Sequence, residues 1–132
     1  MTFLLDTDVC IDFIRQKPQA LIRKLQSCPL GAVATSCVTV AELEYGVARS
    51  SSPERNQAAL DEFLLPLAIV PFDTGAARVY GPLRAHLEGK GTPIGSLDLL
   101  IAAQALASGL TVVTRHVREF RRVPNLRVEI WP

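Results

Sequence analysis

The sequence predicts an α/β fold in which a mostly parallel central sheet carries helices on both faces. Several short apolar runs lack polar alternation, which is typical of strands that are buried on both sides. Helical patterns separate these runs, and a β-α-β-α order favours parallel strands joined by right-handed crossovers. The 132 residues, of which 48% are hydrophobic, suffice for one compact domain and not for two. We therefore expect a single domain over residues 1–132.

The expected elements follow one another without a repeat or a linker. Strands are expected at residues 3–5, 32–35, 67–70 and 111–114, with an alternating edge strand at 126–130. Helices are expected at 9–14, 21–25, 39–47, 53–66, 73–89 and 96–109. Asp8 and Asp73 can cap two of these helices, and Ser52 followed by Pro53 is a strong helix start. Pro82 can kink the helix in which it lies.

The helix expected at 96–109 has the most unusual pattern. From Leu97 to Leu106 nearly every side chain is apolar around the whole circumference, and only Asp98 and Gln104 interrupt the run. A helix that is apolar all round is buried, so we expect it to lie between the sheet and another layer.

The composition excludes several classes of protein. A formal net charge of +1 provides no global field for a polyanion, so nucleic-acid binding must come from a local patch. The three cysteines show no paired spacing and only two histidines are present, which argues against a disulfide framework and a structural zinc site. No apolar run approaches the roughly 18 residues of a membrane span, and no secretion signal is recognisable. We expect a cytoplasmic protein that does not contact membranes.

Four acidic residues follow the expected strands. Asp6 closes the first strand, and Glu42 lies in the first turn after the second. Asp98 lies in the first turn of the buried helix, and Glu119 follows the fourth strand. Because parallel strands end at one edge of a sheet, we expect these carboxylates to gather there. At about 5 Å apart each pair would repel by roughly 3 kcal/mol unless protons or cations neutralised it. Oxygen ligands favour Mg²⁺ or Mn²⁺, the ions with which metal-assisted nucleases activate water.

Most of these carboxylates also have a structural explanation. Thr39 and Glu42 have the spacing of a capping box, and Asp98 suits a helix amino terminus. Glu119 lies among arginines with which it can form an ion pair. Asp6 has no obvious cap or partner, so the structural explanation is weakest for this residue.

Four ordered segments together resemble the signature blocks of a known family. They are FLLDTDVCI at 3–11, TVAELEYG at 39–46, IGSLDLLIAA at 94–103 and TRHVREF at 114–120. In this order they resemble PIN-domain ribonucleases, and most closely the VapC toxins of bacterial type II toxin–antitoxin pairs. The resemblance spans essentially the whole chain and implies a three-layer PIN-like fold.

The resemblance also implies an activity and a site. It implies a Mg²⁺- or Mn²⁺-dependent endoribonuclease that is usually a dimer and is held inactive by a VapB-type antitoxin. By position, Asp6, Glu42 and Asp98 match the metal-binding acids, and Glu119 matches a more variable fourth position. The closing block at 118–124 is similar to that of members that cut the anticodon loop of initiator tRNA, which points to tRNA as a substrate.

Two positions depart from the pattern of the family. Asp8 stands where many relatives have asparagine, which adds a negative charge and still allows helix capping. His116 stands where asparagine or aspartate is common, so a second metal site is less certain than the first. His116 either contacts substrate or is a neutral surface residue.

Basic and hydroxyl side chains surround the expected site. Thr7 and Thr114 end their strands near the acids and can orient a carboxylate or a water. Asp12 is expected to face solvent near Arg15. A cluster of arginines after the fourth strand either binds RNA phosphates in a salt-sensitive way or forms a solvated face. Its members are Arg115, Arg118, Arg121, Arg122 and Arg127.

Other uses of the chain remain open. The large apolar residues of 10–25 and of the helix after Pro53 form either a groove for an antitoxin helix or ordinary core. A catalytically silent PIN-like module would bind RNA or protein without cutting. An unrelated phosphoryl-transfer domain, such as a receiver or phosphatase, would need a lysine after a late strand, where this chain has Arg115.

Overall fold

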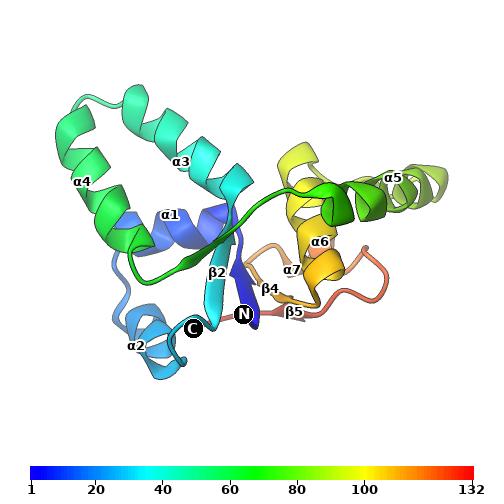
Figure 1. The fold of residues 1–132 in the computed structure, drawn as a ribbon, viewed down its shortest axis with the longest axis horizontal. Helices are drawn as coiled ribbons and strands as arrows, with labels where there is room; N and C mark the ends of the chain where they lie inside the picture. The colour runs from blue at the N-terminus through cyan, green and yellow to red at the C-terminus, as the bar shows by residue number, and fades with distance from the viewer.

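The computed structural model describes residues 1–132 and contains one five-stranded sheet. The strand order is β3-β2-β1-β4-β5, and every neighbouring pair is parallel (Figure 1). The expected α/β fold with a parallel sheet is therefore confirmed. The strands are β1 (Phe3–Leu5), β2 (Val33–Ser36), β3 (Ala68–Val70), β4 (Thr111–Val113) and β5 (Val128–Glu129).

Seven helices cover the two faces of this sheet. Figure 1 shows α1 to α4 on one side of the strands and α5 to α7 on the other. This arrangement gives the expected three layers. The helices are α1 (Thr7–Arg15), α2 (Gln19–Ser27), α3 (Cys37–Ala48), α4 (Pro53–Leu64), α5 (Thr74–Gly89), α6 (Ser96–Ser108) and α7 (Val117–Phe120).

The alternation of side chains along the strands divides the core into two clusters. Leu5 and Val113 pack against apolar residues of α1 to α4 on one face. Leu4 and Val112 pack against α5, α6 and α7 on the other face. All four side chains are fully buried, which explains why the strands read as continuous apolar runs.

The helix starts differ in two places from the sequence prediction. Asp6 caps α1 in place of Asp8, because the strand ends at the residue before Asp6 and the helix begins at the residue after it. Ser36 caps α3 in place of Thr39, since the helix begins directly at the end of β2. Asp73 caps α5 as expected, and its Oδ1 accepts a hydrogen bond from the Ala76 backbone N–H at 2.9 Å.

The remaining helix predictions are largely confirmed. Pro53 occupies the first turn of α4, although the Ser52 side chain makes no capping hydrogen bond. Helix α5 continues through Pro82. Helix α6 is buried in its middle, from Leu99 to Ala105 with Leu100 half-buried, and ends at Gly109, whose φ of 67° is favourable for glycine. None of the helices is both long and apolar enough to cross a membrane.

The apolar side chains of α1, α2 and α4 belong to the core. Cys10, Phe13, Leu21 and Leu60 are all buried in the cluster on that face of the sheet. Core packing therefore accounts for these four residues. Other apolar residues of the same segments are only partly buried, so the antitoxin groove stays a prediction; they are Ile11, Ile14, Ile22, Leu25, Phe63 and Leu64.

Candidate active site

The candidate site lies at the carboxyl edge of the sheet, near the amino-terminal ends of α1, α3 and α6. The chain leaves β1 for β2 on one side and returns to β4 on the other, so β1 and β4 flank the switch point of the sheet. Ligands of open α/β folds bind at such a point. A hollow of about 390 Å³ opens there, and its wall includes Thr7, Asp8, Ile11, Glu42, Ser96 and Asp98.

Asp6 is the buried acid of this site, with 1% of its surface exposed. Its Oδ1 accepts a hydrogen bond from the Val9 backbone N–H at 2.9 Å, and its Oδ2 accepts one from the Thr114 hydroxyl at 2.5 Å. Burial raises the pKa of Asp6, and these two hydrogen bonds act in the opposite direction. The expectation that Asp6 has no cap or partner is wrong, because it is both a helix cap and a hydrogen-bond acceptor from β4.

Asp98 lines the hollow, and Glu119 lies beside Asp98. Asp98 stands in the first turn of α6, as expected. Burial, the negative charges of Glu119 and Asp6, and a hydrogen bond with Glu119 raise the pKa of Asp98 to about 7. Glu119 Oε1 also accepts a hydrogen bond from the Gly95 backbone N–H at 2.6 Å. Glu119 forms no ion pair with the neighbouring arginines, so that explanation of this residue is wrong.

Glu42 is exposed and lines the same hollow from α3. Because α3 begins at Cys37, Glu42 lies in the second turn and not in the first. The capping-box explanation is also wrong, since Thr39 is inside the helix. The Thr39 hydroxyl instead forms a hydrogen bond of 3.0 Å with the Thr7 hydroxyl, which joins the starts of α1 and α3 beside Glu42.

The side chains of this hollow can be tested against the needs of a metal ion. No three histidine, cysteine, aspartate or glutamate side chains are grouped closely enough to hold an ion as they stand. The donors are nevertheless all oxygens, as Mg²⁺ and Mn²⁺ prefer. Asp98 feels the negative charges of both Asp6 and Glu119, and a divalent cation would relieve this repulsion. The exposed Glu42 is free to change its rotamer, so the residues fit such an ion.

His116 is tied to the rim of the site. Its Nε2 pairs with Asp8 Oδ2, and its backbone N–H donates to the Thr114 hydroxyl at 2.8 Å. The same Thr114 hydroxyl donates to Asp6. The pairing of the two residues that depart from the family pattern was missed at the sequence level. The signal in the sequence was that both departures from the family pattern occur together, and that one residue, Asp8, is acidic and the other, His116, is basic.

Of the five arginines in the cluster, three bond to other parts of the chain and two do not. Arg115 forms an ion pair of 3.0 Å with Asp12, whose side chain is only 16% exposed, so the expectation that Asp12 faces solvent is wrong. Arg122 and Arg127 donate to the backbone oxygens of Pro93 and Gly109 and thereby fasten loops. The members without a side-chain hydrogen bond or ion pair are Arg118 and Arg121, both of which are exposed.

Comparison with known proteins identifies the family. Residues 3–126 match the PIN domain model. The chain is 42% identical to Ribonuclease VapC2 of Rickettsia felis, covering 99% of this chain and 98% of the relative. It is also 42% identical to the tRNA(fMet)-specific endonuclease VapC of Salmonella typhimurium, with the same coverage. The chain belongs to the PIN-domain family and is of the VapC type.

Solved VapC structures share the whole fold of this PIN domain. The chain in the DNA-bound VapBC structure from Salmonella typhimurium superposes with a TM-score of 0.96 at 40% identity, covering 100% of this chain and 99% of that one. The chain in the promoter-bound VapBC2 structure from Rickettsia felis gives 0.92 at 39% identity, with both chains covered completely. The resemblance read from the four sequence segments is thus confirmed.

Proposed function

We propose that this VapC-type PIN domain is an endoribonuclease toxin that hydrolyses phosphodiester bonds in RNA and is neutralised by a VapB-like antitoxin. The main support is that Asp6, which follows β1, and Asp98, in the first turn of α6, lie at the carboxyl edge of the sheet, where the negative charges of Glu119 and Asp6 act on Asp98. In this proposal residues 1–132 act as one unit, which forms a homodimer and a hetero-oligomer with the antitoxin. The VapBC structures that resemble this chain support the partner.

The acids of the hollow would hold Mg²⁺ or Mn²⁺. Asp6, Asp98 and Glu42 are the proposed ligands, with Glu119 beside Asp98. When bound, such an ion lowers the pKa of a coordinated water and offsets the charge that develops on the phosphoryl group. The Val9 N–H and the Thr114 hydroxyl fix both oxygens of Asp6, so this carboxylate is oriented before an ion arrives.

Other side chains would position the RNA. Arg118 is exposed on α7 and can bind a phosphate directly. Arg115 would have to exchange its ion pair with Asp12 for a phosphate, or share its free N–H groups. Thr7 and Thr114 bond to Thr39 and Asp6, so we assign them the positioning of the site, with substrate contact at their free lone pairs.

Initiator tRNA is the substrate that we propose. The relatives from Salmonella typhimurium and Shigella flexneri, at 42% and 40% identity, are both tRNA(fMet)-specific endonucleases. In both cases the match covers 99% of this chain.

The test is cleavage of a tRNA(fMet) transcript by the protein freed of any antitoxin, in Mn²⁺, in Mg²⁺ and in EDTA. Asp98→Asn and Asp6→Asn should each abolish cleavage. Asp73→Asn is the matched control, because Asp73 caps α5 with the same geometry as Asp6 caps α1 but lies outside the hollow. Cleavage in EDTA, or cleavage by Asp98→Asn at the rate of the wild type, would contradict the proposal.

The same samples distinguish a nuclease from the alternative, a PIN-like module that binds RNA without cutting it. A protein that only binds RNA would shift the transcript in a gel at every metal concentration and produce no new ends. A VapC-type nuclease produces ends at a defined position that depend on the metal.

A further inference from the structure

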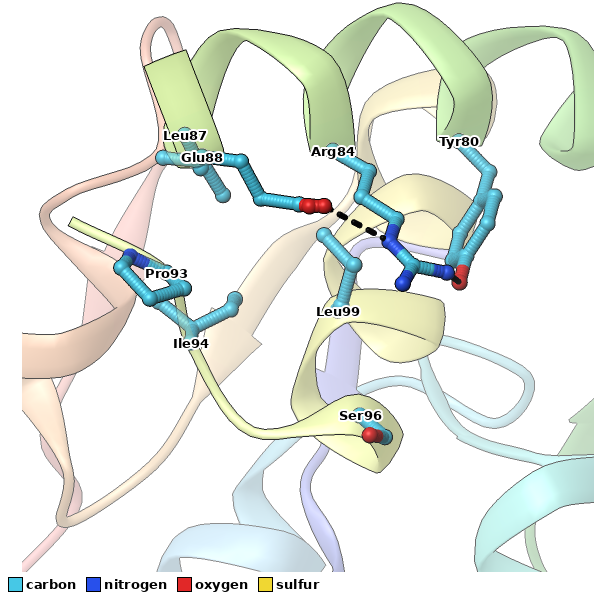
Figure 2. Close-up of a pocket in the computed structure, with 8 residues that line it drawn as sticks. All are labelled: Tyr80, Arg84, Leu87, Glu88, Pro93, Ile94, Ser96 and Leu99. Carbon is cyan, nitrogen blue, oxygen red and sulfur yellow. Dashed lines mark hydrogen bonds and ion pairs between the residues drawn. The ribbon is translucent and has the colours of Figure 1, made fainter. Parts of the chain in front are cut away.

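A second hollow, of about 330 Å³, lies between α5 and the start of α6. Figure 2 shows its lining: the exposed turns of α5 on one side and the segment that leads into α6 on the other. Neither the resemblance nor the proposed chemistry uses it. Its volume is at the lower end of the range for small-molecule sites, so it suits one ring system.

The floor of this hollow is apolar and its mouth is polar. Leu87 and Leu99 are buried beneath it, and Ile94 is half-buried. At the mouth, Arg84 Nε donates to Glu88 Oε1 at 3.2 Å, and Arg84 Nη1 donates to the Tyr80 hydroxyl at 3.1 Å. Figure 2 shows these three side chains in a row across the opening. The two bonds place the guanidinium between Tyr80 and Glu88.

The second hollow adjoins the acidic one. Ser96 lines both, because it stands at the amino terminus of α6 between them. The dividing wall is fixed from behind by α7 and the residues after it. Glu119 accepts from the Gly95 N–H at 2.6 Å, and Arg122 donates to the Pro93 carbonyl at 2.8 Å. These two hydrogen bonds fasten the segment that separates Asp98 from the second hollow.

We propose that the hollow beside Tyr80 and Arg84 binds one nucleobase of the RNA, from a nucleotide that flanks the cleaved phosphodiester. This inference rests on the proposed nuclease function and names a specificity subsite for it. Bases splayed from single-stranded RNA stack on aromatic rings and guanidinium planes and are read along their edges. Tyr80 and Arg84 supply such surfaces, and the Glu88 carboxylate can accept from an exocyclic amino group.

The charge of the hollow favours a base over other occupants. Arg84 and Glu88 compensate each other, so a phosphate would gain one charge contact and meet one repulsion. An aliphatic side chain of a protein partner would cover this ion pair without replacing its lost water. A base has both an apolar face for the floor and polar edges for the mouth.

The test begins with the cut site of the wild-type protein, mapped on the tRNA(fMet) transcript. RNAs are then made with a single abasic ribose at each position on either side of that site. We expect one position at which base removal lowers kcat/KM about tenfold, as the loss of one stacked base does. Arg84→Ala should lower kcat/KM on the intact RNA by a similar factor and have no further effect on that abasic RNA.

Two further variants make the test specific. Arg78→Ala removes the same charge from an exposed site of α5 outside the hollow, and should leave the abasic profile of the wild type unchanged. Glu88→Gln should lower kcat/KM most for the bases at that position that carry an amino group. Arg84 and Glu88 are both half or more exposed, so neither change should prevent folding.

The outcomes separate this inference from the function on which it rests. If the wild-type protein cuts no RNA, both fail. If the protein cuts RNA, but the loss of kcat/KM from Arg84→Ala multiplies with the loss from base removal at every position, the subsite is wrong. The nuclease function is then still supported. Equal effects of Arg78→Ala and Arg84→Ala would also overturn the subsite. A change of oligomeric state caused by Arg84→Ala, without loss of base dependence, would reassign the hollow to a contact between copies of the chain.

Discussion

Asp6 combines two roles that sequence patterns treat as alternatives. It caps α1 through Val9 and accepts from Thr114, and it is also a proposed metal ligand. The carboxylate is almost completely buried, and its removal from water costs free energy. Substitution at this position therefore affects stability and activity by different amounts, which allows the two roles to be separated.

Asp6→Ala is expected to be less stable than Asp6→Asn by about 1 to 2 kcal/mol. Alanine leaves the Val9 N–H and the Thr114 hydroxyl without a partner, whereas the amide oxygen of asparagine can still accept one of these bonds. Both variants should be inactive. Urea denaturation measures the difference, with Asp73→Ala and Asp73→Asn as the matched pair. Equal stability of the two Asp6 variants would show that the cap contributes nothing.

The metal-free protein is expected to become less stable as the pH rises from about 5 to 8. Burial and neighbouring charges raise the pKa of Asp98 to about 7, so the folded state holds a proton that the unfolded chain loses near pH 4. Binding of this proton contributes to the free energy of unfolding at low pH. The contribution is lost as the pH rises through about 7.

The raised pKa values of Asp6 and His116 act with the same sign. Because Asp98 is only half-buried, we expect a loss of about 1 to 2 kcal/mol across this range. Urea unfolding in EDTA measures it, and Asp98→Asn should flatten the profile. A stability that rises with pH would contradict this view of the site.

The sequence named the acids of the site but not their partners. Asp6 is recognisable because it ends an apolar run, and Asp98 because it interrupts one, whereas Glu119 is recognisable only from its place after the fourth strand. The pairs of Asp12 with Arg115 and of Asp8 with His116 join α1 to the loop after β4, segments that are far apart in the sequence. No local periodicity encodes such contacts, so only the fold reveals them.

At the scale of elements, α6 is held to the sheet by one polar residue. Gln104 is buried, accepts from the Ser36 hydroxyl and donates to the Val70 carbonyl at 3.0 Å. Gln104 therefore joins α6, the helix of Asp98, to Ser36. Ser36 caps α3, the helix of Glu42. The apolar pattern predicted that α6 is buried, but it did not explain why a glutamine lies within it.

Gln104→Met should lower the free energy of unfolding by about 2 kcal/mol, since it leaves two buried polar groups without a partner. Gln57→Met is the control, because Gln57 bonds only to Glu44 and Asp61 at the surface. It should change stability by about 0.5 kcal/mol or less. Equal effects in urea denaturation would mean that the buried network is not a stabilising link.

Helix α7 presents Arg118 toward solvent without a side-chain hydrogen bond or ion pair. Arg118→Ala should weaken RNA binding uniformly and reduce the slope of log K against log salt by about 1. Arg127→Ala should leave the slope unchanged, because Arg127 bonds to the Gly109 carbonyl. Filter binding of the inactive Asp98→Asn protein at several salt concentrations measures both. An unchanged slope for Arg118→Ala would remove this residue from the RNA interface.

At the scale of the whole molecule, the three layers follow from the pattern of the strands. Leu4 and Leu5 point to opposite faces, and each meets a different set of helices. This alternation, together with the β-α order, made the fold predictable. The strand order was not predictable from periodicity, since it depends on which crossovers fall on each side of β1.

The most direct test of the central claim is a calorimetric titration of the antitoxin-free protein with Mn²⁺. We expect one site in the wild type that Asp6→Asn and Asp98→Asn each weaken at least about tenfold, since loss of a residue that only supports a ligand already costs this much. Asp73→Asn should leave the site intact. Equal Mn²⁺ affinity in the wild type and in Asp98→Asn would contradict the claim that these distant acids form one metal site.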